Sequence, residues 1–376
     1  MKIIIAPNAF KGSLSADKAA QALKEGLQQG GWKGSLVTCP VGDGGDGTGA
    51  LLRQYLGASV SAIPVCDPLG RWIEAPLGWV ASTQTAIIEM ADASGLRLLQ
   101  PTEYNPLTTN TRGLGQLIKA AFNKRAKTIL LCIGGSATVD GGAGMLQTLG
   151  LQFLDKKGDE LHDLPARFSN LETLDDSGLD RRLAQTSITI LCDVKNKLLG
   201  ENGAAAIFGP QKGADPAGVK MLDSGLQQLD QVVTQYTGFK MSEWESGGAA
   251  GGIAAALAAF GKAQIVPGTD YLLQLIGFKS QLADADWVIT GEGCIDQQTL
   301  QGKAPFGVAK MAKETGAKVI GVAGSIPTSN REALNRYFDW LLPINQPGHS
   351  LAESMRDTFL NLVTAGKKIA GELGPV

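Results

Sequence analysis

The sequence of 376 residues predicts an α/β protein, in which a parallel Rossmann-like sheet domain holds a second α/β domain inserted into it. Short β-branched runs alternate with helical patterns near the N-terminus, which is typical of parallel sheets built from βαβ units. The same alternation returns near the C-terminus. Between them, residues 60–90 alternate short strands with turn residues, as an antiparallel meander does. We therefore predict a discontinuous domain of residues 1–65 and 271–376 and an inserted domain of residues 66–270.

The N-terminal elements are predicted from the spacing of apolar residues. KIIIA (2–6) is a short apolar run rich in β-branched residues, which indicates a buried strand. In SADKAAQALKEGLQ (15–28), apolar residues recur every three or four positions and Ser15 is a typical N-cap, so we predict a helix. SLVTCPV (35–41) predicts the next strand, and a glycine-rich loop follows it.

Three segments near the C-terminus each predict a strand followed by a loop. They begin at Asp286 (DWVITGEG), Ala317 (AKVIGVAGS) and Phe338 (FDWLLPIN). KAPFGVAKMAKETG (303–316) predicts a helix between the first two. Because strand, helix and strand in this order make the βαβ unit of a parallel sheet, we assign these segments to the domain that holds the N-terminal strands.

Charge and composition exclude several classes of protein. The formal net charge is −2 and Lys and Arg are scattered singly, so there is no basic stripe for a nucleic acid backbone. The five cysteines are odd in number and form no CxxC pair, which indicates reduced thiols. The N-terminal apolar run is too short for a signal peptide, and residues 249–260 are too short to span a bilayer. We expect a cytoplasmic protein that binds small molecules, neither nucleic acid nor membrane, with a homo-oligomer left open.

The loop CPVGDGGDGTGALL (39–52) combines phosphate-binding and acidic features. It contains G-x-G-x-x-G at 42–47 after a strand and before a helix, and Asp67 follows at about the distance expected of a ribose-binding acid. Asp43 and Asp46 oppose that interpretation, because two like charges 4 Å apart cost about 4 kcal/mol at an effective dielectric of 20. A divalent cation reverses the sign of this cost, since Mg²⁺ is held by one or two carboxylates together with substrate phosphates.

A purely structural interpretation of this loop stays open. Asp46 could cap the helix that begins near Thr48, and Asp43 could stabilise a tight turn. What favours a site is that glycine-rich or charged loops follow other predicted strands. The side chains and glycines that these loops offer are Gly134, Gly135, Ser136, Thr138 and Asp140, then Asp193, Lys195, Asn196 and Lys212, then Glu292, Asp296 and Lys303.

These loops are predicted to meet in one cleft, since ligands of open α/β sheets bind outside the carboxyl ends of the strands. Backbone donors, cations and acids for Mg²⁺ are what phosphoryl transfer needs. The sequence has no G-x-x-x-x-G-K-[ST] motif, so it is not a P-loop enzyme. Its two histidines, His162 and His349, have no spacing that suggests metal ligation or a Ser-His-Asp arrangement.

The sequence as a whole resembles the class I glycerate kinases, which phosphorylate glycerate with ATP and Mg²⁺. Six stretches carry the resemblance, in order along nearly the whole chain: IIAPNAFKGSLSA, PVGDGGDGT, NPLTTNTRGLGQLI, IGGSATVDGGAGM, CDVKNKLLGENGAAAIFGPQKGA and TGEGCIDQQTLQGKAP. The resemblance implies two α/β domains with the second inserted into the first. It also implies Mg²⁺-assisted phosphorylation of D-glycerate by ATP in an interdomain cleft, with 2-phosphoglycerate favoured over 3-phosphoglycerate.

Two positions depart from the family pattern. The family usually has Asp-Ser where this chain has Asn8 and Ala9, and commonly has Glu where this chain has Asp46. Asn8 keeps a side-chain oxygen but loses the charge, and Asp46 is shorter by one methylene. We expect a working kinase with altered affinity for metal or nucleotide.

Residue roles are predicted for the matching stretches. Asp193 is expected to orient or deprotonate the substrate hydroxyl, with Lys11 and Lys212 as the other catalytic residues. The expected substrate-binding residues are Arg71, Arg112 and Ser13. The expected nucleotide-binding residues are Gly134, Gly135, Ser136, Gly291 and Asp296. The expected Mg²⁺ ligands, directly or through water, are Asp43, Asp46 and Glu292. The alternative for each cation is a solvated surface charge, and for Asp193 a turn acid.

Two other functions are also open. An oxidoreductase would use the G-x-G-x-x-G motif to bind NAD. A non-enzymatic binder of small organic acids, such as the sensing domain of a regulator, would bind glycerate without nucleotide.

Overall fold

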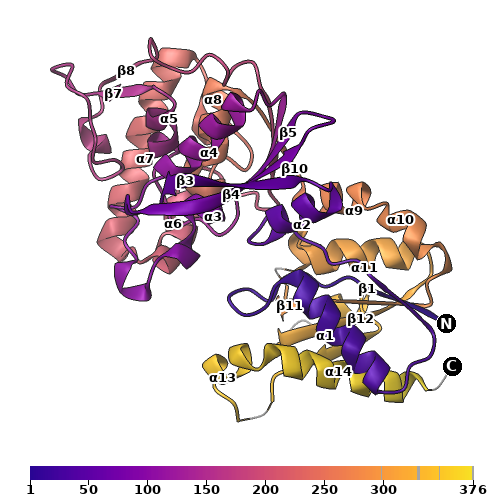
Figure 1. Cartoon of the computed structure of the whole chain (residues 1–376). Coiled ribbons are helices and arrows are strands. Elements are labelled where there is room, and N and C mark those ends of the chain that lie inside the picture. The colour runs from indigo at the N-terminus through magenta and orange to yellow at the C-terminus, as the bar shows by residue number, and fades with distance from the viewer. Residues whose placement is uncertain (298, 328–330, 347, 375–376) are drawn as a thin grey trace. The chain divides into compact units, whose positions relative to one another are not determined.

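The computed structural model describes residues 1–297, 299–327, 331–346 and 348–374 (Figure 1). The chain divides into two compact units. Unit 1 consists of residues 1–43 and 267–376, and unit 2 of residues 44–266. Within the described residues, no helix combines the length and the apolar character that crossing a membrane requires.

Unit 1 is built on a parallel sheet of five strands. They are β1 (Lys2–Ile5), β2 (Ser35–Thr38), β11 (Trp287–Cys294), β12 (Lys318–Ser325) and β13 (Trp340–Pro343), in the order β13-β12-β11-β1-β2. The central strands are continuous apolar runs because both faces of the sheet are covered, as in other parallel sheets.

Helices cover both faces of this sheet. On one face, α1 (Ala16–Gln29) and α14 (Thr358–Leu373) lie side by side over β1, β11 and β12 (Figure 1). Their close approach requires glycine, since a Cβ on Gly26 would lie 2.1 Å from the carbonyl oxygen of Val363. The other helices are α9 (Gly268–Leu275), α10 (Phe278–Gln281), α11 (Ala304–Glu314), α12 (Arg331–Asn335) and α13 (Leu351–Arg356). Of these, α11 packs on β11 and β12, on the face away from α1 (Figure 1).

Unit 2 is built on a mixed sheet of six strands in the order β10-β9-β6-β5-β4-β3. They are β3 (Ser59–Cys66), β4 (Trp72–Val80), β5 (Thr85–Glu89), β6 (Thr128–Cys132), β9 (Ser187–Leu191) and β10 (Lys262–Val266). Strands β5, β6, β9 and β10 are parallel, whereas β3, β4 and β5 form an antiparallel meander. A separate antiparallel pair joins β7 (Gln152–Leu154) and β8 (Thr173–Asp175).

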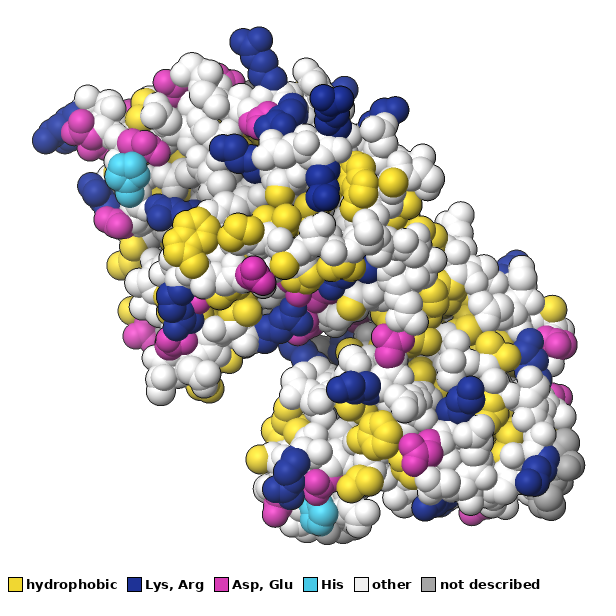
Figure 2. All heavy atoms as spheres, in the orientation of Figure 1, with side chains coloured by type: hydrophobic (Ala, Val, Ile, Leu, Met, Phe, Trp, Pro, Cys, Tyr) yellow, Lys and Arg dark blue, Asp and Glu magenta, His cyan; other side chains and the backbone are white. Residues whose placement is uncertain are grey.

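Most helices of unit 2 and its strands share one large apolar core. The helices are α2 (Thr48–Tyr55), α3 (Ala91–Ser94), α4 (Arg112–Asn123), α5 (Ala143–Thr148), α6 (Ala204–Phe208), α7 (Pro216–Thr237) and α8 (Ile253–Phe260). On the visible face of each unit, Lys and Arg side chains are interspersed with Asp and Glu (Figure 2).

The α/β fold class predicted from the sequence is confirmed. The strands predicted at 2–6, 286, 317 and 338, the helix at 303–316 and the meander at 60–90 are all present. Ser15 caps α1 and accepts a hydrogen bond from Lys18 N at 3.5 Å.

The compact units differ from the sequence-based division (1–65 and 271–376, with 66–270 inserted) mainly at the first boundary. Residues 44–65 belong to unit 2, because α2 packs on β5 and because β3 pairs along its length with β4.

Candidate active site

The order of the strands in unit 1 places a topological switch point between β1 and β11. The chain leaves β1 for its neighbour β2 on one side, and β11 pairs with β1 on the other side. In open parallel sheets, ligands bind outside the carboxyl ends of the strands at this point. Asn8 follows β1 and donates its backbone N–H to the carbonyl oxygen of Gly291 at 2.8 Å, next to Glu292.

Asn8 orients Asp43 by a direct hydrogen bond. Its Nδ2 donates to Asp43 Oδ2 at 3.1 Å, and its Oδ1 accepts from Ala9 N at 2.8 Å. Asn8 is buried, which fixes the amide in this orientation. Asparagine at position 8 therefore brings a hydrogen-bond donor to a neighbouring carboxylate.

Glu292 is a buried carboxyl group near the end of β11. Its Oε1 accepts a hydrogen bond from Thr299 Oγ1 at 3.0 Å, and its Oε2 lies 3.7 Å from Lys303 Nζ. Burial raises the pKa of Glu292 to about 7, while the charge of Lys303 lowers it and the charge of Asp43 raises it. Asp43 and Glu292, both predicted Mg²⁺ ligands, thus interact electrostatically within unit 1.

Two predicted nucleotide-binding residues of unit 1 have structural partners. Asp296 and Thr299 form reciprocal hydrogen bonds, from Asp296 N to Thr299 Oγ1 at 3.1 Å and from Thr299 N to Asp296 Oδ1 at 3.3 Å. A Cβ on Gly291 would lie 2.0 Å from the carbonyl oxygen of Val322. The packing of β11 against β12 is therefore sufficient to require glycine at 291.

Lys11 and Ser13 lie in a turn after β1. Lys11 is exposed, whereas the Ser13 hydroxyl lies 2.6 Å from both Met355 O and Thr358 Oγ1. Ser13 thereby attaches the turn to the C-terminal helices, and Lys11 is presented to solvent.

In unit 2, two glycine-rich segments lie against each other at the end of β6. Gly134 N donates to the carbonyl oxygen of Gly44 at 3.0 Å, and a Cβ on Gly134 would lie 2.4 Å from Gly45 Cα. Gly135 adopts a φ of +75°, in the left-handed region that favours glycine. The absence of side chains here is what allows the two backbones to touch.

Lys212 is a buried cation beside this loop. Its side chain is 2% exposed, and its Nζ donates to Ser136 Oγ at 2.6 Å and to the carbonyl oxygen of Thr138 at 2.7 Å. Burying an ammonium group is costly unless it is hydrogen-bonded, and these two bonds hold Lys212 against the glycine-rich loop.

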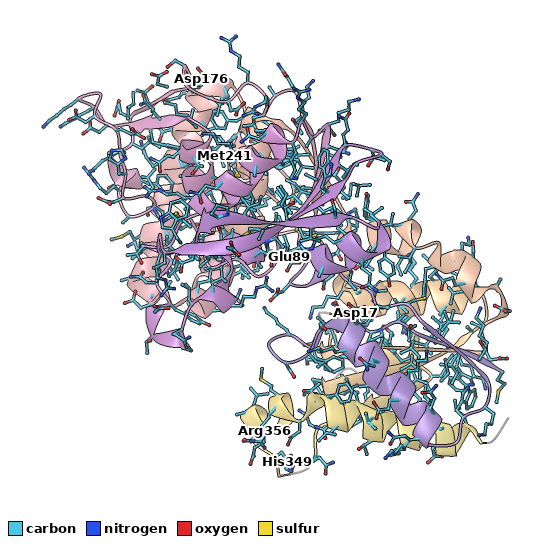
Figure 3. All side chains as sticks on the ribbon, in the orientation of Figure 1. Asp17, Glu89, Asp176, Met241, His349 and Arg356 are labelled. Carbon is cyan, nitrogen blue, oxygen red and sulfur yellow. The ribbon has the colours of Figure 1, made fainter. Side chains whose placement is uncertain are left out.

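Asp46 and Glu89 share the start of α2. Glu89, labelled in Figure 3, is 1% exposed at the end of β5. Its two carboxylate oxygens accept from Gly47 N at 2.7 Å and Gly49 N at 2.9 Å. Glu89, rather than Asp46, therefore holds the first N–H groups of this helix. Asp46 Oδ1 instead accepts from Arg97 Nη1 at 2.7 Å. Burial raises the pKa of Glu89 to about 7, and nearby acidic charges add to this effect.

Asp140 lies in the glycine-rich loop after β6, and its carboxylate has a structural role. It is fully buried and accepts hydrogen bonds from Thr111 N, Thr111 Oγ1, Gly142 N and Gly144 N at 2.7 to 3.1 Å. Burial raises the pKa of Asp140. These contacts hold the threonine-rich segment before α4 against the start of α5.

The remaining predicted residues of unit 2 differ in their surroundings. Asp193 is half-buried, two residues after β9 ends. Arg71 pairs with Asp67 at 2.5 Å and with Glu103 at 2.7 Å, and Asp67 is a turn acid that accepts from the backbone at 2.8 and 2.9 Å. Arg112 begins α4 and donates to the carbonyl oxygen of His162 at 3.2 Å. The side chains of Arg71 and Arg112 are thus held by neighbouring groups of the protein.

Oxygen donors make Mg²⁺ a suitable metal for unit 1. Asp43 and Glu292 supply carboxylates there, while Asp46 belongs to unit 2. Among the residues that the structure describes, no group of three or more His, Cys, Asp or Glu could hold a metal ion. This is compatible with Mg²⁺ held by one or two carboxylates together with substrate phosphates.

Sequence reasoning did not identify Glu89, Arg97 or the hydrogen bond from Asn8 to Asp43. Glu89 had a detectable signal, since it is a lone carboxylate at the end of the apolar run TAIIEM. Arg97 had none, because it is one of many singly scattered cations.

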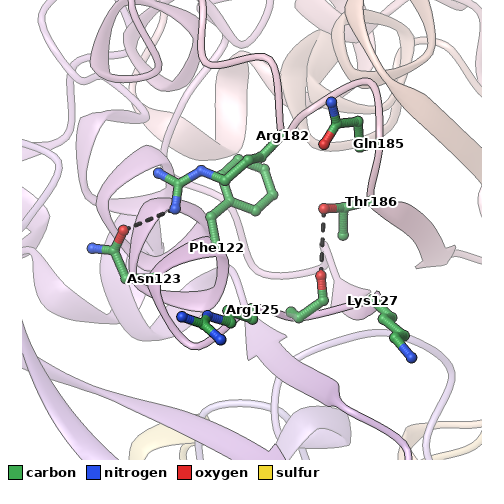
Figure 4. A pocket seen from close by; sticks show the side chains of 8 residues that line it. Phe122, Asn123, Arg125, Lys127, Arg182, Gln185 and Thr186 are labelled. Carbon is green, nitrogen blue, oxygen red and sulfur yellow. Dashed lines mark hydrogen bonds between the residues drawn. The ribbon is translucent and has the colours of Figure 1, made fainter.

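A pocket of about 570 Å³ lies elsewhere in unit 2 (Figure 4). Its wall includes Lys127 and Thr186, which precede β6 and β9. It therefore lies at the amino ends of these strands, opposite the loops described above, and contains none of the predicted site residues.

Comparisons with known proteins identify the family of the chain. The model of the Glycerate kinase family matches residues 3–373. A glycerate kinase of Bacillus subtilis (strain 168) is 43% identical over 96% of this chain and 93% of that protein. A glycerate 2-kinase of Escherichia coli (strain K12) is 40% identical over 99% and 98%.

Among solved structures, one described as glycerate kinase 2 from Salmonella typhimurium LT2 superposes with a TM-score of 0.80 at 37% identity. The match covers 99% of this chain and 98% of that one. A full-length family match, relatives at about 40% identity and a shared fold lead to one conclusion: the chain belongs to the glycerate kinase family and is a kinase.

Proposed function

We propose that this kinase transfers the γ-phosphate of ATP to the 2-hydroxyl of D-glycerate with the help of Mg²⁺, giving 2-phosphoglycerate. The observation that carries the proposal is the buried ammonium of Lys212, bonded to Ser136 and Thr138 beside a glycine-rich loop. The name of the Escherichia coli relative, glycerate 2-kinase, favours the 2-hydroxyl over the 3-hydroxyl.

Unit 2 would supply the phosphate-binding groups. The backbone at Gly134 and Gly135 and the hydroxyl of Ser136 would surround the phosphates, and Lys212 would offset the charge on the transferring group. Asp193 would accept the proton of the glycerate hydroxyl as its oxygen forms a bond to phosphorus and the bond to ADP breaks. Half burial after the end of β9 suits this role, because the side chain is accessible at the carboxyl end of a strand.

Unit 1 would supply metal ligands. Asp43 and Glu292 would hold Mg²⁺ directly or through water, while Asp46, which accepts a hydrogen bond from Arg97, stays a prediction as a metal ligand. When bound, the ion offsets charge on the phosphates. Lys11, exposed on its turn, suits the carboxylate of glycerate. Gly291 and Asp296 for nucleotide, and Arg71, Arg112 and Ser13 for substrate, stay predictions, and each has a structural partner that explains it without a ligand.

The interdomain cleft, the cytoplasmic location and the homo-oligomer also stay predictions. Binding of NADH by the purified protein would favour the oxidoreductase alternative. Binding of glycerate by a protein that does not bind ATP would favour the organic-acid sensor.

The test is consumption of ATP by the purified protein with D-glycerate and Mg²⁺, followed by phosphorus NMR of the product. We expect turnover that needs both additions and a resonance from phosphate on the 2-position. A resonance from the 3-position would overturn the regiochemistry alone, and no turnover by a folded, ATP-binding protein would overturn glycerate as the acceptor. Asp193→Asn with near-normal turnover would remove Asp193 as the base.

A further inference from the structure

The segment before Arg97 is joined to the glycine-rich loop after β6 by backbone hydrogen bonds. Ala137 N donates to Ser94 O at 3.0 Å and Leu96 N donates to Gly135 O at 2.9 Å, with Gly95 and Ser136 paired as an antiparallel bridge. Arg97 follows immediately, in the short helical turn Leu96–Leu98. Its backbone is thus fixed to the loop that Lys212 contacts.

The guanidinium of Arg97 also contacts the acidic loop. It donates to Asp46 Oδ1 at 2.7 Å and to Asp92 Oδ1, and it lies 3.9 Å from Glu89 Oε1. A Cβ on Gly135 would lie only 3.5 Å from Asp46 Cβ, so the two loops are neighbours at this point. Arg97 therefore joins both loops of unit 2 that are proposed to serve the phosphates and the metal.

Arg97 retains capacity for a ligand. Its side chain is 42% exposed, and two of its five N–H groups donate in the hydrogen bonds given above. Arg97 shares Asp92 with a second cation, because Arg53 Nη1 lies 3.2 Å from Asp92 Oδ2. The charge of Asp92 would therefore stay paired if Arg97 bound a ligand. A planar guanidinium with spare donors is well suited to a phosphate group.

From these contacts we propose that Arg97 binds a phosphate oxyanion of the nucleotide, as the exposed counterpart of the buried Lys212. The inference deepens the proposed function and rests on it for the identity of the ligand. The same donors could bind the carboxylate of glycerate. The position of Arg97 on the Gly135–Ser136 segment favours the nucleotide, because that segment is the proposed phosphate loop.

The test compares Arg97→Gln and Arg97→Lys with Arg182→Gln as the matched control. Arg182 also pairs with a carboxylate and its side chain is 41% exposed, but its partner is Asp180 and it lies at the pocket beside Lys127 and Thr186, away from the predicted site residues. Affinity for ADP is measured by calorimetry with Mg²⁺ and again with EDTA, and KM for D-glycerate is measured separately. The EDTA series separates phosphate binding from any effect on a metal held by Asp46.

We expect Arg97→Gln to weaken ADP binding about 10- to 100-fold in both series, the range for one charge-assisted hydrogen bond. Arg97→Lys should lose about 3- to 10-fold, since it keeps the charge without the planar fork. The KM for glycerate of the Arg97 variants and the ADP affinity of Arg182→Gln should stay within about twofold of wild type.

Three results would overturn the proposal. These are unchanged ADP affinity in Arg97→Gln, a loss confined to the KM for glycerate, and wild-type affinity in Arg97→Lys if Arg97→Gln does not fold. Failure of the proposed function gives a different result. If the wild-type protein binds ADP through Arg97 but never phosphorylates glycerate, the proposal for Arg97 stands and glycerate is excluded as the acceptor.

Discussion

The side-chain amide of Asn8 donates a hydrogen bond of 3.1 Å to the carboxylate of Asp43. Asn8→Asp would replace this donor by a second carboxylate. Like charges about 4 Å apart cost up to about 4 kcal/mol at an effective dielectric of 20, so the variant should melt at a lower temperature in EDTA. Mg²⁺ should restore much of this loss, and half-saturation should need less Mg²⁺ than in wild type.

Asn8→Ala is the control for this prediction, because it removes the amide without adding charge. Its loss of melting temperature should not respond to Mg²⁺. Equal responses to Mg²⁺ in Asn8→Asp and wild type would show that position 8 does not face a bound metal ion.

The raised pKa of Glu292 leads us to expect that the stability of the protein depends on pH. Its pKa is about 7 in the folded chain and returns to the ordinary value of 4.5 when the chain unfolds, so between these values the folded protein keeps a proton that the unfolded chain releases. Stability therefore falls as pH rises through this window. Glu292→Gln removes this contribution, and relative to wild type it should gain up to about 3 kcal/mol between pH 5 and 8 in EDTA.

Thermal melts of both proteins across this pH range check the prediction. Glu89 has a shift of the same sign and remains in the variant, so a smaller fall should persist. A constant difference in melting temperature at every pH would exclude Glu292 as a buried acid of raised pKa.

Replacing Lys212 should lower the rate of catalysis much more than the stability of the fold. Lys212→Met removes the donor to Ser136 Oγ and Thr138 O, and loss of one such positioned donor typically lowers kcat about 10²- to 10³-fold. Burial of an apolar chain in place of an ammonium limits the change in melting temperature. Lys220→Met, on the exposed face of α7, is the control and should keep wild-type kcat. Retained turnover in Lys212→Met would exclude Lys212 from the reaction.

Gly49→Ala tests how Glu89 fixes the start of α2. A Cβ at this position would lie 2.7 Å from Glu89 Cβ and 2.8 Å from Glu89 Oε2, so the carboxylate must move away from Gly47 N and Gly49 N. We expect a loss of about 1–3 kcal/mol in the free energy of unfolding, together with weaker ADP binding.

Gly371→Ala provides the opposite case in another helix. Nothing lies within 4 Å of a Cβ at position 371 in α14, so alanine should stabilise by about 0.5–1 kcal/mol. Denaturant titrations of the two variants should move in opposite directions. A stabilised Gly49→Ala would contradict the described contact with Glu89.

Periodicity predicted most elements of the fold because their burial follows the sequence locally. The run KIIIA is apolar on both faces of a covered strand, and the helix after Ser15 buries one stripe of side chains. The first domain boundary was harder, because α2 carries no local sign of which sheet it will pack against. Its membership of unit 2 depends on β5, more than 30 residues later.

The predicted site shows the same limit. Glycines at 134 and 135 and the lysine at 212 could be selected by chemistry, and the structure joins Lys212 to Ser136. Arg71 and Arg112 were chosen as long cations in matching stretches, but their partners are decided by tertiary contacts. Arg97 could not be chosen over them, since its neighbours Asp46 and Asp92 come from two separate segments.

The insertion of unit 2 within unit 1 also bears on biosynthesis. β1 pairs with β2 on one edge, with Ile3 opposite Leu36, and with β11 on the other, with Ile3 opposite Trp287. Residues 44–266 emerge from the ribosome between these two partners. At about 5–20 residues per second, this takes roughly 10–45 s, during which one edge of β1 has no strand to pair with. The pairing of β1 with β11 is thus delayed until the C-terminal part of unit 1 is translated. By that time every residue in the core of unit 2 has already been made.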